Sequence, residues 1–402
     1  MIGSLYSGIS GLKANTSAMA VIGDNIANVS TTGFKGSRVS FANIFSATMG
    51  QSNMQIGRGV TMNGVIPQWQ PGSLENTNSA TDLSINGQGM FVVEDPNDGA
   101  QYYSRAGKFE FDRNGNLVTP DGLLVQGYPI DVNGVQQPLD DIILPNGTNS
   151  PLATDEITME LNLDSQAADG DTYDTTMTVF DSLGTPIELT IQFTYDALAT
   201  EWNWTVTPSA GACASTGTIS FDPDGSLDAA TEAAGDPNIV VTGLTGNDLD
   251  IDWIYTSGGA SDGSVTGYAA DSAKTAQTQN GYPTGRLQGV SVDEDGTFTG
   301  LYSNGTMVPF AQIALADFPS YSGLSKCGSN IFAQSLASGQ ALLATPNTAS
   351  LGSIAPSTLE MSNVDLANEF VQLITTQRAF QANSKVITTS DDVLAELINI
   401  KR

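Results

Sequence analysis

Both ends of the chain carry a narrow apolar stripe in which a large apolar residue returns every seven positions. At the carboxyl end this stripe consists of Leu359, Leu366, Leu373, Phe380, Ile387 and Leu394, with Phe370 beside it. At the amino end it consists of Leu5, Leu12, Met19 and Ile26, with Ile9 near the same face. The period predicts an amphipathic helix over residues 3–27 and a second one from about residue 362 to about residue 400. Because the intervening coiled-coil positions are mostly polar, neither helix can bury enough surface to be stable alone.

The simplest partner for each stripe is the other one. The two helices would form an antiparallel coiled coil if the chain leaves one body and returns to it. The alternative is that each helix docks separately on a globular core. We favour the coiled coil, because a stripe with two residues per heptad is narrower than that of a helix lying on a globular protein.

Local signals set the limits of the two helices. Turn-forming residues such as Asn28 and Gly33 predict the end of the first helix. Ser362 followed by Asp365 resembles a capping box at the start of the second helix. We therefore expect a helical domain made of residues 1–28 and 362–402, followed by an extended linker over residues 29–70.

Between the two ends the sequence pattern changes from helices to strands. The segment "IELTIQFTYDALATEWNWTVTP" alternates apolar and polar residues on both sides of a turn, which predicts a β-hairpin with one apolar face. Four other segments place Asp, Asn and Gly where a tight turn needs them: "FEFDRNGNLV", "TVFDSLGTP", "SFDPDGSLD" and "SVDEDGTFTGLYSNG". We expect an inserted outer β domain at residues 146–280, within a discontinuous β body of residues 71–145 and 281–361. The predicted fold is thus mainly β with terminal α-helices, arranged as nested discontinuous domains.

The formal net charge of -29 is concentrated in the middle of the chain. Residues 1–70 hold four bases and one acid, and residues 361–402 hold four bases and five acids, so residues 71–360 carry a charge of -31. Such a body repels nucleic acid and anionic lipid, and no apolar run is long enough to span a bilayer. We therefore expect no nucleic-acid partner and no membrane insertion. The first twenty residues lack the pattern of a secretory signal, so any export is expected to use a route without a cleaved signal.

No combination of residues predicts a catalytic, cofactor-binding or metal site. The chain has no histidine, which removes the commonest general base and metal ligand, and Cys213 and Cys327 are expected to be free thiols. Asp-rich turns begin at Asp112, Asp222 and Asp293, but none has the acidic twelfth position that a calcium loop needs, so we interpret them as hairpin turns. A hydrolase that uses a pair of carboxylates is an open alternative, for which the abundance of acids gives no specific support.

Two segments near the ends resemble the signatures of the bacterial flagellar rod and hook protein family. They are "GDNIANVSTTGFK", which starts at residue 23, and "SNVDLANEFVQLITTQRAFQANSKVI", which starts at residue 362. The signature positions are Asn25, Asn28, Gly33, Phe34, Ser362, Asn363, Val364, Asp365, Gln377 and Arg378. The segments "LSINGQGMFVV" and "LYSNGTMVPFAQIALADF" resemble the leading and returning halves of the family's body. The long insert resembles the hook branch of the family more than the shorter rod branch.

The resemblance implies a structural subunit without catalytic activity. Its expected function is to build the flagellar hook, a helical tubular polymer that acts as a flexible joint and transmits torque from the rod to the filament. In the family, the terminal helices are disordered in the free subunit and pair on assembly around a central channel. The implied partners are further copies of the chain, the distal rod protein, the hook cap protein, the hook–filament junction protein and the type III export apparatus. The implied location is the flagellum outside the cell.

Besides the hydrolase, two alternatives to a hook subunit stay open at the level of sequence. The first is a distal rod protein of the flagellar basal body, which would share both terminal signatures. The second is an acidic, β-rich extracellular adhesin or binding module.

Overall fold

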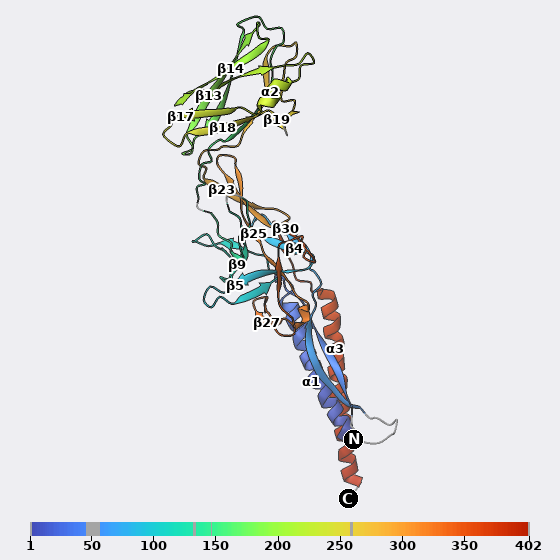
Figure 1. Cartoon of the computed structure of the whole chain (residues 1–402). Coiled ribbons are helices and arrows are strands. Elements are labelled where there is room, and N and C mark those ends of the chain that lie inside the picture. Colours follow the sequence, from blue (N-terminus) through green and yellow to red (C-terminus); the bar gives the residue numbers. More distant parts are fainter. Residues whose placement is uncertain (1, 46–56, 132–133, 146, 258–259, 401–402) are drawn as a thin grey trace. The chain divides into compact units, whose positions relative to one another are not determined.

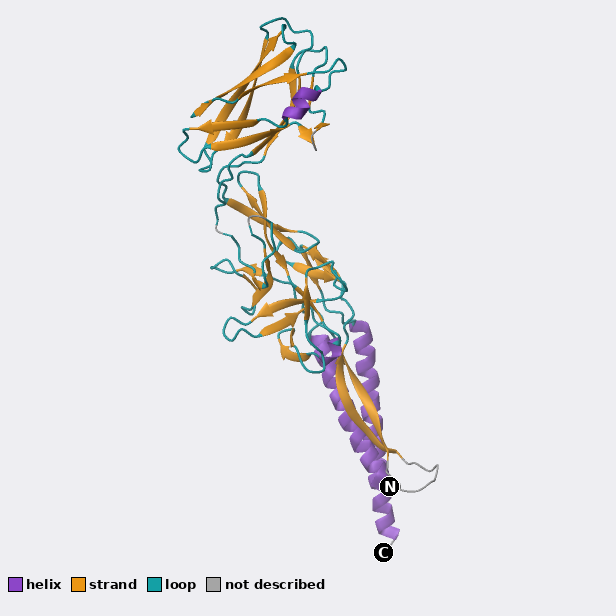
Figure 2. Ribbon diagram, viewed as in Figure 1, coloured by secondary structure: helices purple, strands orange, loops and turns teal. Residues whose placement is uncertain are grey.

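The computed structural model describes residues 2–45, 57–131, 134–145, 147–257 and 260–400 (Figure 1). The chain is mainly β, with a long helix near each end (Figure 2), which confirms the predicted fold class. It divides into two compact units. Unit 1 comprises residues 1–144, 290–300 and 309–402, and unit 2 comprises residues 145–289 and 301–308.

The two terminal helices belong to unit 1 and lie side by side in opposite directions (Figure 1). Helix α1 spans Ile2–Ala27 and helix α3 spans Leu366–Ile400. Near one end of the pair, Ser4 Oγ and Ser390 Oγ are 3.3 Å apart. Near the other end, Asn25 Nδ2 donates a hydrogen bond to Glu369 Oε1 at 3.2 Å. The antiparallel pairing expected from the two stripes is therefore present within a single chain.

The stretch expected to be an extended linker holds a two-stranded antiparallel ribbon. Strand β1 (Ser37–Phe45) pairs with strand β2 (Gly57–Pro67), and the ribbon packs along α1 (Figure 2). The extended backbone was predicted, but the pairing was not. The reason is that residues 46–56 contain no Asn-Gly or Asp-Gly pair, the short-range signal of a hairpin.

A branched sheet of 13 strands lies mostly in unit 1. Its main path follows β23 (Leu287–Val292), β24 (Thr297–Tyr302), β25 (Met307–Ile313), β9 (Leu124–Pro129), β5 (Met90–Glu94), β6 (Gln101–Ser104), β28 (Ile331–Ala333) and β27 (Ser325–Gly328). Its branches are β7 (Glu110–Phe111), β8 (Leu117–Val118), β10 (Asp140–Asp141), β26 (Leu315–Asp317) and β29 (Leu342–Ala344). Phe91, Phe298 and Met90 are fully buried in its two apolar clusters.

Two short antiparallel pairs connect the segment before the sheet with the segment before α3. They are β3 (Leu74–Asn76) with β31 (Thr358–Glu360), and β4 (Leu83–Asn86) with β30 (Ser353–Pro356). The chain that leads into α3 is thereby held against the chain that follows the ribbon. This pairing positions the site described below.

Unit 2 consists of two sheets around one apolar core. The first sheet contains β15 (Ala212–Cys213), β17 (Asn238–Thr242), β18 (Leu249–Ile254), β11 (Glu156–Asn162), β21 (Val265–Thr266) and β22 (Ala273–Gln279). The second contains β12 (Thr172–Phe180), β13 (Pro186–Asp196), β14 (Glu201–Pro208) and β16 (Thr216–Ser220). A short helix α2 (Ala229–Ala234) and the pair β19 (Thr256–Ser257) and β20 (Ala260–Ser261) complete the unit. Strands β13 and β14 form the hairpin predicted from its alternating pattern, and Phe193 and Trp204 on its apolar face pack against Trp253.

The chain enters and leaves unit 2 along neighbouring segments. Leu152 and Tyr282 exchange backbone hydrogen bonds, each 3.0 Å long. Asn149 N–H donates to the carbonyl of Gly285 at 3.0 Å, and Asn149 Oδ1 accepts from Gly285 N–H at 2.6 Å. The expected insert at residues 146–280 lies inside this unit, which extends beyond it to residue 289 and includes residues 301–308.

Candidate assembly site

Helix α1 meets α3 through some of its smallest residues. The buried positions of α1 recur at spacings of three and four: Gly8, Gly11, Ala14, Ala18, Ile22 and Asn25. A Cβ atom placed on Gly8 would lie 2.9 Å from Ile387 Cγ1, and one placed on Gly11 would lie 2.8 Å from Asn383 Oδ1. Such separations are shorter than real Cβ atoms make, so glycine at both positions allows the two helices to approach closely.

The large residues of the predicted stripes are only partly covered by this contact. On α1, Leu5, Leu12, Met19 and Ile26 are half-buried and Ile9 is exposed. On α3, Leu373, Phe380, Ile387 and Leu394 are half-buried, while Leu366 and Phe370 are exposed. None of the residues of α3 from 366 to 396 is fully buried. In the single chain the stripes therefore keep apolar surface for a further partner.

Leu359 does not belong to the helical stripe, which corrects the prediction from the heptad count. It lies in strand β31, where it pairs with Glu75 of β3, ahead of the helix, which starts at Leu366. Asp365 Oδ1 accepts hydrogen bonds from the N–H groups of Ala367 at 2.8 Å and Asn368 at 3.3 Å, and thereby caps the first turn. The helix therefore begins after Asp365 and not at Ser362.

Exposed large apolar side chains gather on the terminal helices and the ribbon. On α1 and the ribbon they are Tyr6, Ile9, Phe41, Ile44, Met62, Val65 and Ile66. On α3 they are Leu366, Phe370, Val371, Ile374, Val386 and Val393. Exposed apolar groups concentrated on a few elements mark an interaction surface.

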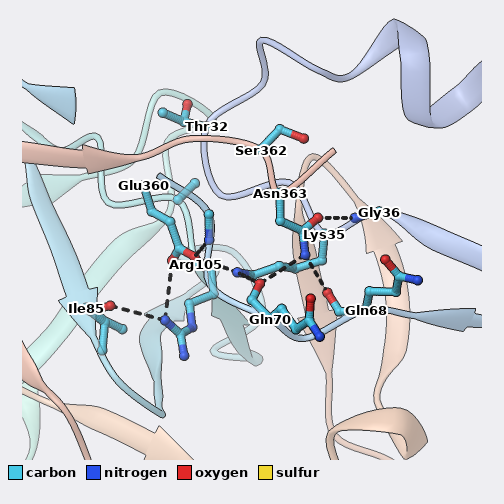
Figure 3. Close-up of polar contacts among 12 residues, drawn as sticks. Thr32, Lys35, Gly36, Gln68, Gln70, Ile85, Arg105, Glu360, Ser362 and Asn363 are labelled. Atoms are coloured by element: carbon cyan, nitrogen blue, oxygen red, sulfur yellow. Dashed lines mark hydrogen bonds and ion pairs between the residues drawn. The ribbon is translucent and has the colours of Figure 1, made fainter. Parts of the chain in front are cut away.

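A buried ion cluster joins both ends of the chain to the body (Figure 3). Glu360 Oε1 lies 2.5 Å from Lys35 Nζ, and Glu360 Oε2 lies 3.3 Å from Arg105 Nη1. The side chains of Lys35 and Glu360 are 1% and 0% exposed. Glu360 Oε1 also accepts from the N–H of Gly72 at 2.8 Å, and Lys35 Nζ donates to the carbonyl of Gln70 at 2.9 Å. One buried carboxylate is thus paired with two cations from separate segments. A buried charge needs such partners, because burial removes the water that would otherwise stabilise it.

The electrostatics of the cluster follow from its burial. Burial lowers the pKa of Lys35 below the ordinary lysine value because it disfavours the charged ammonium. The Glu360 carboxylate opposes this effect, and the second cation, Arg105, acts in the same direction as burial. Removal of Glu360 would therefore leave two buried cations without their counter-ion.

Asn363 connects the segment before α3 with the segments on both sides of the ribbon (Figure 3). Its Oδ1 accepts from the N–H of Gly36 at 2.8 Å. Its Nδ2 donates to the carbonyls of Gln68 at 2.8 Å and Gln70 at 2.9 Å. A single side chain amide therefore binds three backbone groups at this junction, and it shares the carbonyl of Gln70 with Lys35 Nζ.

Asn25 and Asn28 fix the end of α1. The Asn25 side chain donates to the carbonyl of Ser37 and accepts from its N–H, both at 2.9 Å. Asn28 Nδ2 donates to the carbonyl of Asp24 at 2.9 Å. The Asn25 bonds hold the last turn of α1 against the start of β1, and the Asn28 bond closes the end of the helix itself.

The remaining signature residues divide into two groups. Gly33 has φ of +68°, and a Cβ there would lie 2.5 Å from the backbone nitrogen of Ala106, so only glycine fits. Phe34 is buried beside it, and Val364 is half-buried at the same junction. Gln377 and Arg378, by contrast, are exposed on α3 and lie away from this junction.

The hairpin of β27 and β28 contacts the segment after α1 at two points. Lys326 Nζ donates to Ser37 Oγ at 2.8 Å, and Asn330 Nδ2 donates to the carbonyl of Thr32 at 2.9 Å. The turn residues Ser329 and Asn330 both have positive φ, +45° and +58°, a conformation that costs free energy in residues other than glycine. The hairpin thus holds residues 32–37 in place.

The other chemical groups considered from the sequence have simple roles. Cys213 is half-buried and Cys327 is exposed, and both are free thiols, as predicted. Asp112 Oδ1 accepts from the N–H groups of Asn114 and Asn116, each at 2.8 Å, so it stabilises its own turn. Among the described residues, no group of three or more His, Cys, Asp or Glu side chains could hold a metal ion. No helix in the described part of the chain is both long and apolar enough to cross a membrane.

Models of four sequence families match the chain. The family described as flagella basal body rod protein matches residues 5–35, and the flagellar basal body rod FlgEFG protein C-terminal family matches residues 355–400. The flagellar hook protein FlgE/F/G D1 domain matches residues 84–161, and the flagellar basal body protein FlaE D2 domain matches residues 148–282. The first two families cover most of both terminal helices and include Lys35 and Glu360 of the ion cluster. The chain is therefore a protein of the flagellar rod and hook class.

Relatives along the whole chain define the branch of this class. The chain is 32% identical to flagellar hook protein FlgE of Borreliella burgdorferi, with 100% of both chains covered. It is 33% identical to flagellar hook protein FlgE of Salmonella typhimurium, covering 99% of this chain and 100% of the relative. The crystal structure of Helicobacter pylori flagellar hook protein FlgE2 has a similar fold, with a TM-score of 0.56 at 14% identity over 71% of this chain and 100% of that one. The chain belongs to the flagellar hook protein family, and it is a structural component of the bacterial flagellar hook.

Proposed function

We propose that copies of this chain polymerise through α1, α3 and the ribbon into a helical tube that acts as a flexible joint and transmits torque from the rod to the filament. One observation carries this proposal: exposed large apolar side chains gather on the terminal helices and the ribbon. The acidic residues, in contrast, are concentrated in residues 71–360. The ends of the chain are thus suited to close contact with other copies, and the body is suited to solvent.

The free energy of burying apolar side chains favours a second copy of the chain as the partner that covers the exposed surface of α3. Helix α3 has no fully buried residue from 366 to 396, although it is 35 residues long. Full burial of one large apolar side chain contributes about 1.5–3 kcal/mol. Several such side chains covered in each subunit would offset the entropy lost on association.

The ion cluster gives the proposed joint a firm internal connection. The bonds from Lys35, Arg105 and Asn363 link the helix pair to the body, so a force on the body is transmitted to the helices. Contacts between the polar surfaces of neighbouring bodies can shift at little net cost, because water replaces a lost hydrogen bond. Such a combination suits a tube that bends without coming apart.

Family membership supports a set of further partners and a purely structural role. The proposed partners are the distal rod protein, the hook cap protein, the hook–filament junction protein and the type III export apparatus. Neither nucleic acid nor a membrane is among them, and we assign no catalytic activity. Relatives named hook protein and the D2 domain match at residues 148–282 favour a hook subunit over a distal rod protein or an adhesin.

Electron microscopy of a strain that lacks this gene tests the proposal. We expect basal bodies without hooks, and hooks restored by the unaltered gene. Leu373→Asp should not restore them. The substitution places a charge on the half-buried stripe, and a second subunit that covers the stripe would bury this charge without an oppositely charged partner. Leu198→Asp in unit 2 is the control and should restore hooks, because Leu198 is 96% exposed. Normal hooks in the deletion strain would overturn the proposal.

A further inference from the structure

Two hollows of about 540 Å³ and 240 Å³ lie between α1 and the ribbon, and together we call them the α1–β2 groove. Tyr6, Ile44 and Arg58 line the larger hollow, and Lys13 and Met62 line the smaller one. The side chains of Arg58 and Lys13 are exposed, and within the described residues the structure has no ion pair at either. The groove therefore offers two free cations beside apolar side chains.

Helix α3 carries a second stripe that does not face α1. Val386, Thr389, Val393 and Glu396 follow one another at spacings of three, four and three, which places them on one side of the helix. Val386 and Val393 are 44% and 45% exposed, and the acidic Asp392 flanks the stripe. We call these four residues together with Asp392 the outer stripe.

The outer stripe cannot reach the groove of its own chain. Within the chain, Ile387 lies against Gly8 and Ser390 against Ser4. Consecutive residues of an α-helix are rotated by about 100°, so Thr389 and Glu396 are about 160° and about 180° around α3 from Ile387. By the same rule, Tyr6 and Lys13 are about 160° and about 140° around α1 from Gly8. The stripe and the groove therefore lie on sides of their helices that face away from each other, and a groove that receives the stripe must belong to another copy.

We propose that the outer stripe of one subunit docks in the α1–β2 groove of a second copy. Glu396 and Asp392 would lie opposite Arg58 and Lys13, and the two valines would cover Tyr6 and Ile44. Charge complementarity identifies the occupant: residues 1–70 hold four bases and one acid, while the outer stripe combines acids with exposed apolar groups. The inference rests on the proposed self-assembly and adds to it the pair of surfaces that meet.

Charge reversal in the full-length chain tests the pairing. The critical concentration for polymer formation is measured by sedimentation at low salt, and circular dichroism checks that each variant is folded. The critical concentration is expected to rise roughly tenfold in either of two double variants. One combines Lys13→Glu with Arg58→Glu, and the other combines Asp392→Lys with Glu396→Lys. All four substitutions in one chain should restore the critical concentration to within about twofold. The differences should shrink in 1 M salt, where the Debye length is about 3 Å.

Matched controls separate this pairing from the effect of net charge. The control for the Asp392 and Glu396 variant combines Asp174→Lys with Glu188→Lys, two exposed residues of unit 2, and changes the net charge by the same amount. The control for the Lys13 and Arg58 variant combines Lys108→Glu with Arg113→Glu, two exposed bases of the body. Both controls are expected to polymerise normally. Polymerisation of the Lys13 and Arg58 variant at the normal concentration, or no restoration by the fourfold exchange, would overturn the pairing.

Cross-linking between copies gives an independent measurement. In a chain with Cys213→Ser and Cys327→Ser, one copy carries Arg58→Cys and another carries Glu396→Cys. Oxidation of the mixed polymer should give covalent dimers, and a polymer that yields monomers alone would refute the pairing. Failure of the unaltered chain to polymerise would instead count against the proposed function itself, so the two failures are distinguishable.

Discussion

Lys35 Nζ lies 2.5 Å from Glu360 Oε1, although the two residues are 325 positions apart in the sequence. Lys35 follows the end of α1 by eight residues, and Glu360 precedes the start of α3 by six. The contact therefore fixes the two points at which the helices leave the body. Since both side chains are buried, loss of either one would leave the charge of the other buried and uncompensated.

Glu360→Gln is expected to lower the free energy of unfolding of unit 1 by about 3–5 kcal/mol, because Lys35 and Arg105 would be left buried without a carboxylate. Hydrogen–deuterium exchange checks this prediction, with faster exchange expected in unit 1 and unchanged exchange in unit 2. Glu75→Gln on the exposed face of β3 serves as control and should stay within about 0.5 kcal/mol of the unaltered protein. Equal effects of the two substitutions would contradict the importance of the cluster.

Replacement of Gly8 and Gly11 together by alanine is expected to separate α1 from α3. Each added Cβ would meet α3 at less than 3.0 Å, and overpacking of this kind costs about 1–3 kcal/mol. The matched control replaces Gly3 and Gly23, where a Cβ meets nothing within 4 Å, and should raise helix stability through the better propensity of alanine. Exchange rates of the α3 amides are the readout, and protection in the test variant equal to that in the control would refute the close contact.

Tyr321 is expected to make unit 1 sensitive to alkaline pH. Burial raises the pKa of Tyr321, and its hydrogen bond to Asp317 Oδ1 at 2.7 Å adds to the effect. A folded pKa above the unfolded value of about 10 contributes stability that is complete below that pH and is lost as the pH rises above it. Tyr321→Phe should therefore flatten the loss of stability between about pH 10 and pH 12 in urea unfolding. Tyr6→Phe, at a residue that is 65% exposed, should leave the slope unchanged.

The two thiols are expected to react at different rates without prior reduction. Cys327 is exposed in β27 and should react with a thiol reagent faster than Cys213, which is half-buried in β15. Replacement of both by serine should leave polymer formation intact, because Cys213 lies in β15 of unit 2 and Cys327 in β27, and neither strand belongs to the helices or the ribbon. A shifted, oxidised monomer on a non-reducing gel would contradict free thiols.

The heptad period predicted both helices and their pairing, but not the residues at the centre of the contact. A search for large apolar residues finds Leu5 and Leu12. Gly8 and Gly11, however, act through the volume that they leave free. A periodic pattern of side chains does not reveal that role. The sequence signal was therefore right about the elements and incomplete about the interface.

The ion cluster could not be predicted from the sequence, for a different reason. Lys35 lies inside a segment that resembles the family, but Glu360 is one acid among 43 acidic residues. Its two partners are 325 and 255 positions away, and only the folded chain brings them together. In contrast, Asn25 and Asn363 were named in advance as signature residues, and each satisfies backbone groups at the same junction.

The backbone pairing of Leu152 with Tyr282 makes residues 152–282 a closed excursion of the chain. Because its two ends are already held together, lengthening the sequence between them adds little to the free energy of closure, about 0.6 kcal/mol for each doubling. A larger or wholly different domain can therefore be accommodated between residues 152 and 282 while the helices, the ribbon and the ion cluster stay unaltered. The inserted part of such a subunit is free to diverge between organisms, and the polymerising part is not.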